Sequence, residues 1–152
     1  MPTAVKSGLN MTVAVWFKAT TVASNGSDLV SFGSDVSLRI KADQIEWVKR
    51  RSTTSGEIFA VAKAVTTAPV DNRWHHMAGT MSANGMNLYF DGALVGSSSS
   101  TEPVIFNGPD QVTAGRMPGY STHSHTGQLD EVRVYGRVLS AAEIANLARG
   151  NR

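Results

Sequence analysis

The sequence contains no cysteine, and this absence excludes several kinds of site at once. Without thiols the chain cannot form disulfides, bind a metal through thiolates or use a cysteine nucleophile. Its stability must therefore come from side-chain packing. Cysteine usage also gives no indication of the redox compartment.

Charged residues are sparse, at 17% of the 152 residues against about 25% in an average globular chain. The 14 basic and 12 acidic residues leave a net charge of +2, which predicts no basic face and no nucleic-acid partner. No apolar run approaches the ~20 residues of a membrane span, so we expect no membrane insertion. Residues 1–7 lack the apolar stretch of a signal peptide, and a secreted or virion location both stay open.

Alternation of apolar and polar residues recurs along the chain and predicts many short antiparallel strands. Asp91-Gly92 lies between two such patterns and predicts a two-residue type I′ hairpin. We expect loops over residues 50–56 and 116–126, the second being the longest irregular stretch. The expected strands cover residues 12–18, 36–40, 44–49, 57–65, 74–78, 86–90, 93–95, 104–106, 111–114 and 128–135.

One helix is predicted, over residues 141–149. Ser140 and Glu143 have the spacing of a capping box, and Leu139 before the cap can contact Ile144. Gly150 supplies the stop. These elements predict an all-β fold, a single domain over residues 1–152 in which a two-sheet antiparallel sandwich is closed by one short C-terminal helix.

Four segments together closely resemble the laminin-G-like branch of the concanavalin A-like lectin/glucanase fold. They are residues 11–18, 74–80, 87–96 and 127–144, which contain Trp-His-His-Met-Ala-Gly-Thr, Asn-Leu-Tyr-Phe-Asp-Gly and Leu-Asp-Glu-Val-Arg-Val-Tyr. The resemblance implies a jelly-roll sandwich and a non-catalytic module that binds glycans or a surface partner.

The N-terminus departs from this family, because only Met1 to Asn10 precede the first central strand. Relatives usually begin with a further strand, which is shortened or absent here. In many of them that strand helps to hold a structural calcium, so the resemblance leaves calcium open, with Asp130 as the one candidate ligand. A missing strand would also expose a sheet edge, and we expect self-association or docking through that edge.

A second function fits the short, free-standing chain without a signal: a structural or decoration protein of a virus or phage particle, assembling as an oligomer or on a capsid lattice. An enzyme is not expected. Related glucanases carry acidic residues at alternating positions of one strand, whereas Asp130 and Glu131 are adjacent and should point to opposite faces.

The candidate ligand-binding residues are Arg116, Tyr120, His123, His125 and Trp47. The first four lie in the long loop, since loops on a rigid scaffold often carry function, and the aromatic rings could stack on sugars. His123 and His125 could instead converge on a metal, although no third ligand is near in sequence.

The remaining aromatic and basic residues are expected to be structural. We expect Trp16 and Trp74 in the core and residues 49–51 at a solvated hairpin tip. His75 and His76 should lie on opposite faces of one strand.

Overall fold

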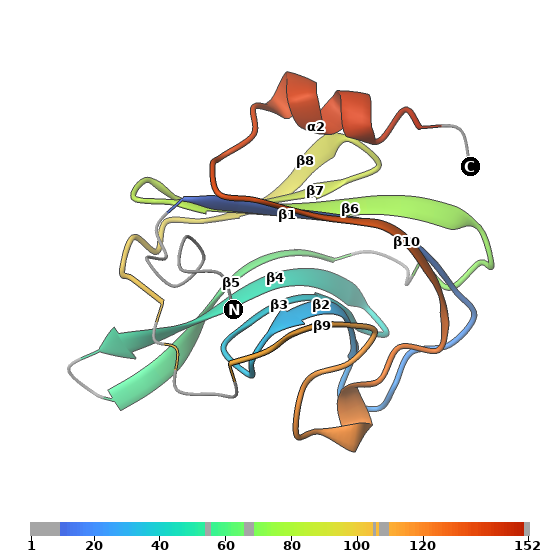
Figure 1. Ribbon diagram of the computed structural model, residues 1–152, viewed down its shortest axis with the longest axis horizontal. Coiled ribbons are helices and arrows are strands. Elements are labelled where there is room, and N and C mark those ends of the chain that lie inside the picture. The colour runs from blue at the N-terminus through green and yellow to red at the C-terminus, as the bar shows by residue number, and fades with distance from the viewer. Residues whose placement is uncertain (1–9, 54–55, 66–68, 105, 107–109, 151–152) are drawn as a thin grey trace.

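The computed structural model describes residues 10–53, 56–65, 69–104, 106 and 110–150. Within them two five-stranded antiparallel sheets pack face to face (Figure 1). Sheet A has the order β10 (Gly127–Tyr135), β1 (Met11–Ala19), β6 (Trp74–Ser82), β7 (Gly85–Phe90) and β8 (Ala93–Ser98). Sheet B has the order β5 (Gly56–Val65), β4 (Gln44–Thr53), β3 (Val36–Ile40), β2 (Ser27–Phe32) and β9 (Val112–Ala114). The predicted jelly-roll sandwich with one short C-terminal helix is confirmed.

The main core fills the space between the sheets. Trp47 is fully buried there, and its indole N–H donates to the Thr80 carbonyl at 3.0 Å. Its ring covers Gly79 so closely that a Cβ on that glycine would lie 2.4 Å from Trp47 Cδ2. Trp47 was predicted to contact glycans, but it presents no face to a ligand. Trp16 and Trp74, predicted as core, are only partly buried.

Helix α2 (Ala141–Leu147) lies on the outer face of sheet A (Figure 1). The predicted capping box is present: the Ser140 hydroxyl accepts from the Glu143 N–H, and the Glu143 carboxylate accepts from the Ser140 N–H. Leu139 and Ile144 are buried together in a second cluster, as predicted for the contact across the cap. The helix ends two residues before the predicted boundary. No helix in the described part of the chain is long and apolar enough to span a membrane.

A β-bulge interrupts the side-chain alternation of β10. Arg133 pairs with Ala14 and Asp130 with Trp16, so two residues of β10 face one of β1, and Glu131 takes a φ of 51°. Leu129 consequently packs between the sheets, whereas Tyr135 packs on the outer cluster below α2. Strict alternation along β10 would place these two side chains on the same face, and the extra residue reverses it.

Most of the strand predictions are confirmed, and the Asp91-Gly92 turn has the expected positive φ angles of 47° and 84°. The loop predicted over residues 50–56 was wrong, because β4 continues to Thr53 and β5 begins at Gly56. β2 was not predicted at all. The short strand expected over 104–106 and the shortened first strand fall partly or wholly on residues outside those described.

Candidate functional site

The outward face of sheet B, turned away from sheet A, carries charged side chains in the middle of two central strands. Arg39 alternates with the core residues Leu38 and Ile40, and Glu46 and Arg50 alternate with core-facing positions of β4. The β3–β4 register places Arg39 directly opposite Glu46. Side-chain alternation and register therefore bring opposite charges together on this face.

Residues 115–126, the β9–β10 loop, cover one side of this face and include the 3-10 turn η1 (Ser121–His123) (Figure 1). Several hydrogen bonds fix the loop to the strands behind it. Gly115 N–H donates to the Leu29 carbonyl at 2.9 Å, and the Ser27 hydroxyl donates to the Ser124 carbonyl at 3.3 Å. The turn closes through the Tyr120 N–H, which donates to the Met117 carbonyl. The loop is therefore held in place by the sheet.

A cavity of about 380 Å³ lies between this loop and the two strands. Its size falls at the lower end of the range of roughly 300–1,000 Å³ that small-molecule sites occupy. The polar part of its lining includes Arg39, Lys41, Glu46 and Arg50, and the apolar part includes Val48, Val61 and Met117. Tyr120 and His123 of the loop also line it.

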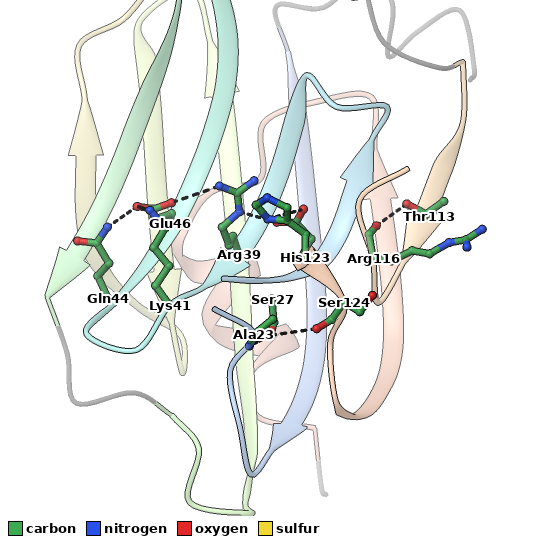
Figure 2. A network of polar contacts seen from close by, with 11 residues as sticks. Ala23, Ser27, Arg39, Lys41, Gln44, Glu46, Thr113, Arg116, His123 and Ser124 are labelled. Carbon is green, nitrogen blue, oxygen red and sulfur yellow. Dashed lines mark hydrogen bonds and ion pairs between the residues drawn. The ribbon is translucent and has the colours of Figure 1, made fainter. Parts of the chain in front are cut away.

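Ion pairs connect the polar side of the cavity (Figure 2). Arg39 Nε donates to Asp28 Oδ1 at 2.6 Å, and Lys41 Nζ lies 3.0 Å from Glu46 Oε1. A longer contact of 3.9 Å joins Arg39 to the second oxygen of Glu46. At the other end Arg50 pairs with the buried Asp35 at 3.0 Å. The cavity wall is thus a network with its charges already paired.

His123 faces this network from the loop. Its Nδ1 lies 3.9 Å from Asp28 Oδ2, and both atoms are buried with no hydrogen-bond partner. Burial lowers the pKa of His123 below its usual 6.5; Arg39 and Lys41 lower it further, while Asp28 opposes them. The imidazole is therefore neutral at pH 7.

The structure brings two of the five predicted site residues into the cavity. Tyr120 is 50% exposed and meets His123 edge-on, with 5.8 Å between the ring centroids. Arg116 is exposed and its side chain points away from the network (Figure 2). His125 is partly buried and does not line the cavity. With Trp47 in the core, Tyr120 and His123 remain from the predicted set.

Sequence reasoning missed the charged strand residues of the cavity. Residues 49–51 were expected at a solvated tip, but Lys49 is 1% exposed, and its Nζ donates to the Ser100 and Glu102 carbonyls. Arg50 then lies in mid-strand on the outward face. The signal was available in part, because Arg39, Glu46 and Arg50 occupy the non-core positions of strands next to each other in the chain.

The described residues contain no group of three or more His, Asp or Glu side chains arranged to hold a metal ion. His123 lies beside Asp28 and Arg39, whereas His125 lies beside the backbone of Gln128 and Lys18. Burial lowers the pKa of His125, and these backbone contacts oppose the shift. Asp130 Oδ1 accepts from the Glu131 N–H at the bulge. A calcium ion at Asp130 stays a prediction.

The model of a family described as the concanavalin A-like lectin/glucanases superfamily matches residues 2–145. No curated protein matches the sequence. One similar solved structure is domain 4 of AbnA, an extracellular GH43 arabinanase of Geobacillus stearothermophilus, in complex with arabinotriose. Its TM-score is 0.74 at 14% identity, over 96% of this chain and 69% of that chain.

Two further solved structures share the fold. The CBM40 of the Ruminococcus gnavus IT-sialidase, bound to alpha2,3 sialyllactose, has a TM-score of 0.71 at 18% identity, over 96% of this chain and 86% of that one. A heptameric SAP-like pentraxin from Limulus polyphemus has a TM-score of 0.67 at 14% identity, over 93% and 70% of the two chains. At these identities the likeness establishes the fold alone.

Proposed function

We propose that this chain, which belongs to the concanavalin A-like lectin/glucanase superfamily, is a non-catalytic module that binds a glycan in the cavity under the β9–β10 loop. The observation that carries the proposal is the pairing, in one cavity, of an exposed aromatic ring with a fixed polar network. A sugar presents the complementary surfaces, namely an apolar C–H face and a rim of hydroxyl groups.

The apolar side of the cavity suits the flat face of a sugar ring. Tyr120 is half exposed, and Val48, Val61 and Met117 provide apolar surface in the same cavity. Aromatic rings at binding sites supply contact area at a low entropy cost, since they have few rotatable bonds. Tyr120 is therefore the stacking residue of the proposed site.

The carboxylates favour binding over hydrolysis. Glycoside hydrolases need two carboxyl groups about 5–9.5 Å apart, one on each side of the scissile bond. Among the described residues that line the cavity, Glu46 is the one carboxylate, and it is ion-paired to Lys41. Asp28 and Asp35 lie behind the wall, at 0% and 1% exposure. This arrangement gives the site no acid and nucleophile pair.

The neighbours agree with a glycan ligand more than with the virion alternative. Two of the similar structures hold an oligosaccharide, arabinotriose in one and sialyllactose in the other. These neighbours give no support to a decoration protein or a capsid lattice. Assembly through the β10 edge stays a prediction, with Val132 and Val134 about 40% exposed there.

A glycan array followed by calorimetry on the best ligand tests the proposal. Tyr120→Ala should weaken binding about tenfold, because one stacking contact is worth up to about 1.5 kcal/mol. Leu94→Ala removes an exposed apolar side chain, 56% exposed on β8, and is the matched control that should bind normally. Glycan binding that survives Tyr120→Ala unchanged would place the site elsewhere, and a chain that binds no glycan would refute the function.

A further inference from the structure

Each cation that lines the cavity forms an ion pair with a carboxylate. Arg39 pairs with Asp28, Lys41 with Glu46, and Arg50 with Asp35. The three pairs sum to zero charge. Among the described residues of the wall, every positive charge that an anionic ligand could contact is therefore already paired with a carboxylate.

Two of the three carboxylates are too buried to move away from their cations and be replaced by a ligand anion. Asp28 and Asp35 are buried in the sheet, and Glu46 is 4% exposed. Taking a cation away from a buried carboxylate leaves an uncompensated charge out of water, which is strongly unfavourable. Glu46 also lines the cavity itself and would repel an anion placed beside it.

Neutral hydroxyl groups meet no such conflict. A guanidinium has five N–H donors and an ammonium three, so each cation keeps donors for a ligand beyond its ion pair, and Glu46, the carboxylate that lines the cavity, keeps acceptor positions. Sugar hydroxyls both donate and accept, and neighbouring hydroxyls on a ring can bridge such a pair. His123 contributes a ring that is neutral at pH 7, since burial and the cations beside it lower its pKa.

We propose that the cavity selects a neutral, hydroxyl-rich sugar over sugars that bear a carboxylate or sulfate. This inference rests on the proposed function, because it names the class of glycan that the same site takes. It also separates this chain from the neighbour that binds sialyllactose, whose fold it shares at 18% identity.

The first test compares neutral oligosaccharides with uronic-acid, sialylated and sulfated ones on the intact chain. The best neutral ligand should bind at least about tenfold more tightly than its acidic counterparts. Its affinity should change by less than about twofold between 50 mM and 500 mM NaCl, since no ligand charge is screened. A preference for acidic glycans that falls steeply with salt would overturn the inference and leave the proposed function intact.

The second test changes the charge of the cavity. Glu46→Gln keeps the shape and gives the wall a net charge of +1, so binding of an acidic sugar should strengthen at least about fivefold while neutral binding does not improve. Glu131→Gln is the matched control, because it too removes the carboxylate partner of a cation, here Arg133, but on the exposed surface of β10. It should leave both affinities unchanged.

The outcomes remain distinguishable if the variant is unstable. A Glu46→Gln chain that does not fold leaves the decision with the salt dependence and the ligand preference of the natural chain. Acidic sugars that bind no better to folded Glu46→Gln than to the natural chain would contradict the charge argument. Loss of all glycan binding in the natural chain refutes the proposed function, and with it this inference.

Discussion

His76 should make the stability of this protein fall as the pH is lowered from about 6.5 to about 4. It lies in β6 on the outer face of sheet A, is 2% exposed, and meets Trp16 edge-on at 5.4 Å between ring centroids. Its buried Nδ1 has no hydrogen-bond partner. Burial lowers the pKa of His76 to about 4, with Asp91 opposing the shift and Arg133 adding to it.

The sign and size follow from the difference between the two states. In the unfolded chain a histidine has a pKa of about 6.5, so between pH 6.5 and 4 the unfolded state binds a proton that the folded state does not. Stability therefore falls as the pH is lowered through this window. A shift from 6.5 to about 4 corresponds to a loss of about 3 kcal/mol from His76.

Urea unfolding at half-unit steps from pH 8 to pH 4 measures this loss. His76→Phe keeps an aromatic ring against Trp16 and cannot titrate, so the decrease over the window should shrink by about 3 kcal/mol. The same slope in the variant as in the natural chain would refute the reasoning, as would an NMR titration that finds the pKa of His76 near 6.5. The low pKa values of Asp71 and Glu143, about 2 each, also reduce stability below about pH 5, but they do so equally in the variant and in the natural chain and cancel in the comparison.

Two further predictions concern the fold. Gly79→Ala should destabilise the protein by about 3 kcal/mol, because the new Cβ would lie 2.4 Å from the Trp47 ring, which a hydrogen bond to the Thr80 carbonyl holds in place. Chemical denaturation measures the loss of stability, and a loss below about 1 kcal/mol would contradict the packing. Ser140→Ala removes the helix cap and should cost about 1 kcal/mol in the same assay, whereas the exposed Ser99→Ala should cost nothing measurable, and equal losses would contradict the capping role.

The sequence predicted the parts of the fold that local rules decide. The Asp91-Gly92 turn and the Ser140 cap depend on residues close together in the chain, and both were located correctly. The bulge at Glu131 was missed because it depends on how β10 pairs with β1, more than 100 residues away in the chain. Trp47 was misplaced for the same reason: what buries it is the bare backbone of Gly79 in the opposite sheet.

The candidate site was predictable only in its loop half. Tyr120 and His123 stood out as an aromatic residue and a histidine in a long polar loop. The other half depends on contacts between distant positions, since Asp28, Arg39 and His123 come from two strands and a loop. Nothing in the segment around Asp28 or around Arg39 distinguishes either residue from an ordinary solvated side chain.

β2, the strand that the sequence analysis did not predict, also supports the candidate site. Ser27–Phe32 lacks polar and apolar alternation because all six residues are buried, on one face by the core and on the other by the β9–β10 loop. The buried Asp28 side chain is paired with Arg39, whose Nε lies 2.6 Å from it. A strand of a sandwich that is buried on both faces shows no alternation. If such a strand also carries an acidic residue, this indicates that another part of the chain covers the sheet there. That covering segment is where a binding loop should be sought.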